Sequence, residues 1–260
     1  MFEQLVNNSQ IFLIIFARVF AFLAAAPLFS STGFPGVARV GLGFFSAMVV
    51  FPWVSSSYAI PDTGLAYIFI LLGESLIGLI IAFIVLAFFS VFQIAGELFG
   101  FQMGFNAASV YDPLAQQELP LMGQFVNNIA ILIFLVSSGM VKIFYVGIYY
   151  SFKYLKAIDI ATTRDSFLAL FMRLLGSLFS SGFVLALPIV CVLILVTVSM
   201  GIMGKAAPQM NLLMMGFPIS ISVGFIILML FIPFMAEYVD SFFAYLYRAL
   251  VNSFSTGSVI

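Results

Sequence analysis

Six blocks of apolar residues, each long enough to cross a lipid bilayer as a helix, constrain this chain more than any other feature. A helix needs about 20 predominantly apolar residues to span a hydrocarbon core roughly 30 Å thick. Backbone groups in lipid must bond within the segment, and the period-two alternation of barrel strands is missing. The sequence therefore predicts an all-α integral membrane protein with six main apolar helices. The blocks are Ile11–Leu28, Val37–Val54, Leu65–Ile94, Phe125–Tyr150, Gly176–Met203 and Leu212–Met235.

The composition removes several classes of function. Only 7% of the residues are charged and 64% are hydrophobic, whereas a soluble domain carries roughly 25% charged residues. The net charge is −1, so there is no basic patch for nucleic acid. The chain has no His and a single Cys, Cys191, which excludes imidazole chemistry and a disulfide within the chain. We therefore expect no cofactor, no metal site and no catalytic residues.

Most of the charge lies outside the apolar blocks. We interpret Ser151–Arg173, which contains four Lys or Arg and two Asp, as an aqueous loop with a short amphipathic helix. The residues after Met235 are predicted to form an amphipathic tail helix. Because the positive-inside rule counts Lys and Arg near the membrane, this loop would place both termini in the cytoplasm.

The segment Gly96–Gln124 fits neither a membrane helix nor a solvated loop. It has no Lys or Arg, and it is rich in Phe and Met. Gly96, Gly100 and Gly104 would form a smooth stripe on a helix, which is typical of close packing against another backbone. Alternatively, the glycines let the segment bend, so that Phe101, Met103 and Phe105 fill a constriction and then move. The residue types leave both interpretations open.

Three charges fall inside apolar blocks, namely Arg18, Glu74 and Lys142. Charges at membrane depth are costly and therefore indicate function by default. Glu74 is flanked by Gly73 and Ser75, which would let a neighbouring helix come close. A proton or ion site is one interpretation, and a structural pair with a partner helix is the other. Without His or a nearby second carboxylate, the pattern favours the structural pair.

Three stretches resemble the FliR family of flagellar export proteins, which is called SctT in injectisomes. The resemblance covers nearly the whole chain in the family's order. Lys205 stands where the family usually has Arg, and Ser137–Lys142 replaces a stretch that commonly contains His. The stretches comprise Arg18, Pro27, Gly33-Phe34-Pro35 and Arg39; Gly96–Phe105, Ala107 and Asp112-Pro113; and Ala186-Leu187-Pro188, Ala207–Asn211 and Gly216-Phe217-Pro218.

The resemblance implies a core subunit of the type III protein export gate in the bacterial inner membrane, required for flagellum assembly. It implies a FliP-like part over about 1–175 fused to a FliQ-like hairpin and tail over about 176–260. The chain would join FliP-like and FliQ-like subunits, as one copy, in a helical ring that projects toward the periplasm. Its other expected partners are FlhB-like and FlhA-like export proteins, unfolded exported proteins and membrane lipid.

The resemblance also implies roles for two groups of residues. The segment 96–124 matches the family's plug, which sits in the closed pore. Residues around 204–218 match a hairpin tip that faces the cytoplasm, contrary to the orientation predicted from charge. The expected plug residues are Gly96, Gly100, Phe101, Met103, Gly104, Phe105, Asn106 and Asp112, and the expected tip residues are Lys205, Pro208, Gln209, Asn211, Gly216 and Pro218.

Two alternatives stay open at this point. The same subunit type occurs in the injectisome, so the virulence-associated SctT gate is one alternative to the flagellar one. A small-solute secondary transporter is the other, because Pro188, Pro218 and Pro233 are positions at which its broken helices would be expected. The sequence shows no clear internal repeat of the kind that such transporters carry.

Overall fold

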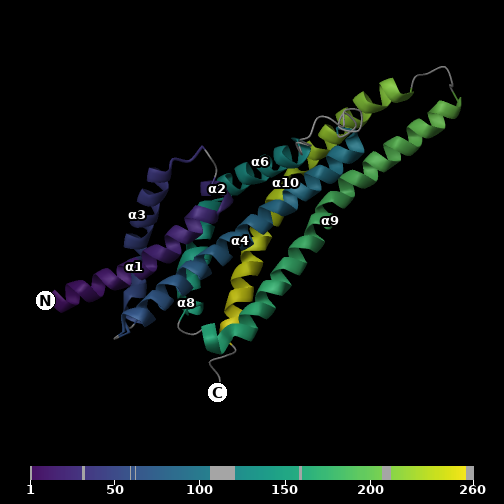
Figure 1. Ribbon diagram of the computed structural model, residues 1–260. Helices are drawn as coiled ribbons and strands as arrows, with labels where there is room; N and C mark the ends of the chain where they lie inside the picture. The colour runs from purple at the N-terminus through teal and green to yellow at the C-terminus, as the bar shows by residue number, and fades with distance from the viewer. Residues whose placement is uncertain are drawn as a thin grey trace. The chain divides into compact units, whose positions relative to one another are not determined.

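The structure is a computed structural model that describes residues 2–30, 33–58, 60–61, 63–105, 121–157, 160–206 and 212–255 (Figure 1). Every regular element in this part of the chain is helical, which confirms the predicted all-α class. The elements are α1 (Phe2–Ala25), α2 (Pro27–Ser30), α3 (Gly36–Val54), η1 (Ser55–Ser57), α4 (Gly64–Met103), α6 (Leu121–Val136), α7 (Gly139–Lys142), the π-helical η2 (Ile143–Tyr149), α8 (Tyr150–Tyr154), α9 (Ile160–Ala206) and α10 (Leu212–Ser255).

Within the described residues, five helices are long and apolar enough to cross a membrane. The count rises to six if the broken pair Leu121–Val136 and Gly139–Tyr154 forms one span. That break lies at Ser138, whose φ of 59° is left-handed and interrupts the helix. The helices α9 and α10 instead continue through Pro188, Pro218 and Pro233.

The extended loop with a short amphipathic helix that was predicted over Ser151–Arg173 is wrong in its secondary structure, because α8 and α9 cover most of this stretch. Helix α9 begins at Ile160 and runs without interruption to Ala206. The stretch from Ile160 to Arg173 contains neither Gly nor Pro, so nothing in it stops a helix from continuing. The predicted tail helix after Met235 is likewise the second half of α10 rather than a separate element.

The chain divides into two compact units, each assembled from distant segments. The first consists of Met1–Ala87, Ser138–Leu175 and Phe242–Ile260, and the second of Phe88–Ser137 and Gly176–Ser241. One break falls between Leu175 and Gly176, at the expected boundary, but each unit also contains a segment from the other side of that boundary. The expected boundary separates parts by their resemblance to other proteins rather than by compactness. The FliP-like and FliQ-like division therefore stays a prediction.

Aromatic and aliphatic side chains form the core of each unit. In the first unit, α1 contributes the buried Ile14, Val19 and Phe22, and its Phe12 packs edge-on against Phe44 of α3 at 5.2 Å between ring centroids. In the second unit, Phe89 of α4 meets Phe134 of α6 at 5.5 Å. Close aromatic packing of this kind contributes more than the buried area alone.

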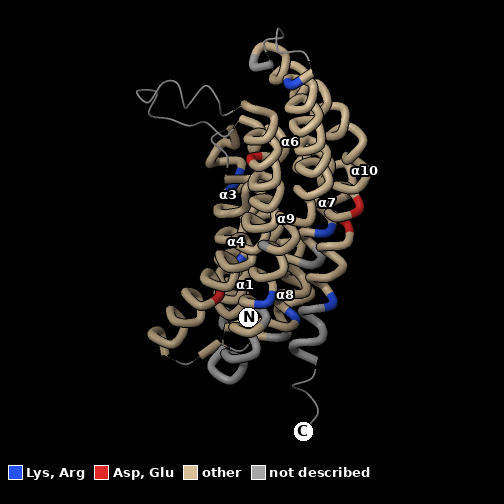
Figure 2. The backbone as a smooth tube through the Cα atoms, turned by 90° about the vertical axis from the view of Figure 1, so that its right-hand side faces the viewer, with Lys and Arg blue, Asp and Glu red and all other residues tan. Residues whose placement is uncertain are grey.

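Charged residues are sparse along the backbone of both units (Figure 2). Many large apolar side chains are nevertheless exposed, among them Phe45, Trp53, Phe69 and Leu72. An apolar surface on this scale is unsuited to water and requires lipid or other protein around it.

Candidate functional site

The first candidate site is a buried ion pair in the first unit. Arg18 of α1 and Glu74 of α4 have side chains that are 2% and 0% exposed, and they form a salt bridge. The Nε of Arg18 donates to Oε2 of Glu74 at 2.5 Å. The guanidinium also lies over the ring of Phe152, 4.1 Å from its centroid, a cation–π arrangement.

Two glycines of α4 make room for this pair. A side chain at Gly78 would overlap the backbone oxygen of Arg18, so only glycine lets α1 and α4 approach this closely. A Cβ at Gly73 would lie 2.8 Å from the Cβ of Ala157. The expectation that Gly73 lets a neighbouring segment come close to Glu74 is therefore confirmed.

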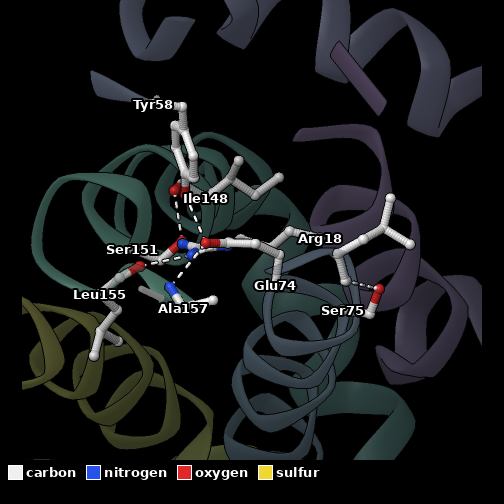
Figure 3. A network of polar contacts seen from close by, with 9 residues as sticks. Arg18, Tyr58, Glu74, Ser75, Ile148, Ser151, Leu155 and Ala157 are labelled. Atoms are coloured by element: carbon white, nitrogen blue, oxygen red, sulfur yellow. Dashed lines mark hydrogen bonds and ion pairs between the residues drawn. The ribbon is translucent and has the colours of Figure 1, made fainter. Parts of the chain in front are cut away.

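The pair binds the backbone where α8 ends. Leu155 leaves the helix with φ −127° and ψ 102°, and its carbonyl accepts from Nη2 of Arg18 at 2.6 Å. The N–H of Ala157 donates to Oε1 of Glu74 at 2.9 Å. A cation next to the final carbonyls of a helix is favourable. The backbone carbonyl and N–H that are left without helical partners where α8 ends bond to Arg18 and Glu74 instead. Figure 3 shows the hydrogen bonds converging from these segments.

Two side-chain hydroxyls complete the network. Tyr58 donates to Oε1 of Glu74 at 2.8 Å. Ser151 accepts from Nη1 of Arg18 at 3.2 Å and donates to the carbonyl of Ile148 at 2.7 Å. Ile148 belongs to the π-helical turn η2, and such turns displace backbone groups from the usual helical ladder.

This arrangement is the structural pair that the sequence favoured. All three guanidinium nitrogens of Arg18 and both oxygens of Glu74 have partners within the chain. A buried charge pair with complete hydrogen bonding fixes geometry. Sequence reasoning identified Arg18 and Glu74 separately but missed Tyr58 and Ser151. Lys142, the third intramembrane charge, lies in the last turn of α7.

The second candidate site is the end of α4, in the second unit. Gly96 and Gly100 lie against α6, where added Cβ atoms would approach the carbonyl of Met122 to 2.6 Å and the Cβ of Met122 to 2.8 Å. The α4 part of the predicted glycine stripe thus packs against another helix. Ordinary close packing is sufficient to explain Gly96 and Gly100.

Gly104 has a different role, because it ends the helix. Its φ is +86°, and the N–H of Phe105 donates to the carbonyl of Gly100 at 2.9 Å while that of Gly104 donates to Phe101 at 3.1 Å. This pair of bonds is a Schellman motif, in which glycine takes the left-handed position. The motif ends α4 within the expected plug segment 96–124.

The aromatic and Met side chains at this end have unlike surroundings. Met103 is fully buried and its thioether lies against Gly224 of α10. The ring of Phe105 lies 6.4 Å from that of Phe225 in α10. Phe101 is 72% exposed. The expected plug residues Asn106 and Asp112 lie outside the described residues.

The expected hairpin tip is divided between helix ends and undescribed residues. Lys205 occupies the last turn of α9 and is exposed, whereas Gly216 and Pro218 lie inside α10. Gly216 faces Met200 of α9, so the two helices are adjacent there. Pro208, Gln209 and Asn211 lie outside the described residues. The connection between α9 and α10 is therefore shorter than the predicted tip.

These features define a multi-pass helical membrane protein whose helices are fixed by buried polar and glycine contacts. Residues 9–255 match the family of bacterial export proteins, family 1. The chain is similar to a protein named flagellar biosynthetic protein FliR from Bacillus subtilis (strain 168), with 32% identity over 87% of each chain. It is 30% identical to the protein of the same name from Borreliella burgdorferi, over 89% of this chain and 86% of the relative. It is 26% identical to that from Escherichia coli (strain K12), over 92% of this chain and 90% of the relative. The chain belongs to this FliR family of flagellar export proteins.

Proposed function

We propose that this chain is a core subunit of the flagellar type III export gate, in which its helices pack on FliP-like and FliQ-like subunits around a closed conduit. Family membership supports the process, namely flagellar protein export. The gate itself is supported by one structural observation. The chain exposes large apolar side chains on helices of both units, which suits contact with sister subunits as well as lipid.

In this proposal residues 96–124 are the plug segment, which begins in the last turns of α4. The Schellman turn at Gly104 directs the chain away from α4, and Met103 and Phe105 hold that turn against α10. Phe101 stands exposed on the preceding turn of α4. An apolar constriction excludes water and ions until it moves. The plug therefore has a base at the end of α4 that packs against α10, and Asn106 and Asp112 belong to the plug in this proposal by resemblance to the family.

The remaining parts of the proposal concern location and partners. The subunit resides in the bacterial inner membrane as part of the flagellar basal body, and the assembly projects toward the periplasm. The connection between α9 and α10, with Lys205 beside it, faces the cytoplasm near FlhB-like and FlhA-like proteins. The exported cargo is unfolded protein, and the chain performs no catalysis. Relatives named for flagellar biosynthesis favour the flagellum over the injectisome.

The test is a deletion of residues 101–112 in the chain expressed with its FliP-type and FliQ-type partners. We expect the complex to assemble and the membrane to leak small solutes, because the apolar seal has been removed. Complex formation is measured by co-purification and native mass measurement, and leakage by dye or ion flux. Normal impermeability in cells that contain the assembled deletion complex would reject the plug.

A small-solute transporter is the rival from another class. It would purify as a stable monomer and bind or move its solute unaided. Continuous helices through Pro188, Pro218 and Pro233 remove the sequence signal that suggested it. A wild-type chain that is monodisperse alone and gains no stability from the partners would favour the transporter over the gate.

A further inference from the structure

Glu97 is an acidic residue inside an apolar helix of the second unit. It lies in the candidate membrane span Gly64–Met103 and is only partly buried. Its described hydrogen bonding is limited to Nε2 of Gln93, one turn earlier on α4, at 3.3 Å. An ionised carboxylate at membrane depth needs more than one weak neutral donor. Glu74, with its full set of donors, shows what such a group obtains when its own chain satisfies it.

The second unit has no cation within reach of Glu97. Residues 88–137 and 176–241 contain a single Lys, Lys205, and no Arg. Helices α4 and α9 run in the same direction, since Gly182 lies against Val91 and Gln102 donates to Thr197. Lys205 is eight residues beyond Thr197 while Glu97 is five residues before Gln102. At 1.5 Å per residue the two charges are about 20 Å apart along the helices.

The carboxylate of Glu97 lies at the contact between α4 and α6. A Cβ at Gly123 of α6 would lie 3.1 Å from Oε1 of Glu97, so this oxygen lies against that turn of α6. The same oxygen accepts the hydrogen bond from Gln93.

We propose that Glu97 is a receptor, on the α4–α6 face, for a Lys or Arg side chain from a neighbouring membrane subunit. An ammonium or guanidinium carries several donors and a positive charge, so it supplies the carboxylate with the charge and the donors that Gln93 alone does not. Glu97 is partly exposed, so a side chain from outside the chain can reach it. The proposal rests on the proposed function, because it requires sister subunits in the membrane.

The experiment compares Glu97→Lys and Glu97→Gln in the full complex with the FliP-type and FliQ-type partners, with the tag on this chain. Lys places like charges together, so we expect about tenfold less co-purified partner, which corresponds to about 1.4 kcal/mol. Gln keeps the shape and loses the charge, and its effect should be smaller. The matched control is Glu237→Lys, because Glu237 is an exposed carboxylate of the same unit on α10.

Charge reversal identifies the cation. Each Lys and Arg in the membrane segments of the partners is changed to Glu in the Glu97→Lys background. Recovery of assembly by one such pair supports the site. Partner yield at the wild-type level with Glu97→Lys overturns it. A wild-type chain that captures no partner overturns the export-gate function as well, so the two failures are distinguishable.

A photo-crosslinker at Leu98 covers the case in which Glu97→Lys does not fold. Leu98 neighbours Glu97 and is itself 36% exposed, so the native site stays intact. A crosslink to a partner peptide that contains Lys or Arg supports the proposal. No protein crosslink, or a crosslinked peptide without either residue, overturns it and leaves lipid or a water-filled conduit as the neighbour of Glu97.

Discussion

Arg18 and Glu74 are 56 residues apart in the sequence and form a salt bridge in the core of the first unit, with both side chains excluded from solvent. Both side chains also bind a third segment. Arg18 donates a hydrogen bond to the carbonyl of Leu155, and Glu74 accepts one from the N–H of Ala157, so the two charges satisfy the backbone where α8 ends. The pair therefore fixes α1 and α4 to the short connection between α8 and α9.

The first prediction is that Arg18→Met strongly destabilises the protein. The substitution leaves the Glu74 carboxylate buried without its cation, a situation that costs about 3–5 kcal/mol. For a chain of this size the thermal midpoint should fall by about 10 °C. The measurement is thermal unfolding of the purified complex in detergent. Arg248→Met, at an exposed cation of the same unit, should change the midpoint little.

Two companion variants separate charge from geometry at the same site. Arg18→Lys retains the charge but cannot hydrogen-bond to Glu74, Ser151 and Leu155 at once, so the free energy of unfolding should fall by about 1–3 kcal/mol. The double variant Arg18→Met with Glu74→Leu should recover only part of the loss, since the backbone of Leu155 and Ala157 remains without partners. An Arg18→Lys protein as stable as the wild type would show that the hydrogen-bonding geometry is unimportant.

The second prediction ranks two glycines of α4. A Cβ at Gly96 would meet the carbonyl of Met122 at 2.6 Å and the Cα of Gly123 at 2.8 Å, and neither backbone atom can move without its helix. A Cβ at Gly100 would meet the side chain of Met122, which is flexible. We expect Gly96→Ala to cost about 1–3 kcal/mol and Gly100→Ala to cost less.

Thermal unfolding of the two variants checks this order. Gly201→Ala is the control, because Gly201 lies in α9 with nothing within 4 Å of its added Cβ. Replacement there should be neutral or slightly stabilising, since Ala favours helix more than Gly. Equal losses at Gly96 and Gly100 would contradict the assignment of the tighter contact to Gly96.

Much of the helical pattern was predictable because apolar length is a property of sequence alone. The blocks Val37–Val54 and Leu65–Ile94 correspond to α3 and α4. The extent of α9 was missed, because the charges of Ser151–Arg173 suggested a solvated loop. The helix propensity of these residues nevertheless lets α9 begin at Ile160. Charge alone did not distinguish a loop from a helix there.

The buried network was only half predictable for a related reason. Arg18 and Glu74 stand out as charges in apolar blocks, and Gly73 signals a close neighbour. The groups that they bind at Leu155 and Ala157 are backbone atoms, which carry no residue-type signature. The π-helical turn that places Ser151 is also invisible in a sequence pattern. Tertiary contacts of this kind emerge only when distant segments are placed together.

The third prediction concerns the end of α4. Gly104 has φ +86°, a conformation that costs a residue with a Cβ about 1 kcal/mol or more. A Cβ there would also overlap the ring of Phe217. Gly104→Ala should therefore destabilise the second unit in thermal unfolding. Adding Phe217→Ala to Gly104→Ala removes the overlap but not the backbone strain, so the double variant should be less stable than Phe217→Ala alone. Equal stability of the two would show that the left-handed backbone at Gly104 does not require glycine.

The fourth prediction separates sealing from folding at Phe101 and Met103. Met103 is 0% exposed, so Met103→Ala should leave a cavity against α10 and lose about 2–5 kcal/mol. Phe101 is 72% exposed, so Phe101→Ala should change stability by no more than about 0.5 kcal/mol. If Phe101 contributes to the plug, its loss should raise ion flux through the assembled complex while the thermal midpoint stays constant. Both quantities are measured on the same co-purified complexes.

Two results would remove Phe101 from the seal. A Phe101→Ala complex whose ion flux equals that of the wild type would show that Phe101 does not help to close the conduit. A Phe101→Ala chain that fails to assemble would assign Phe101 to subunit packing.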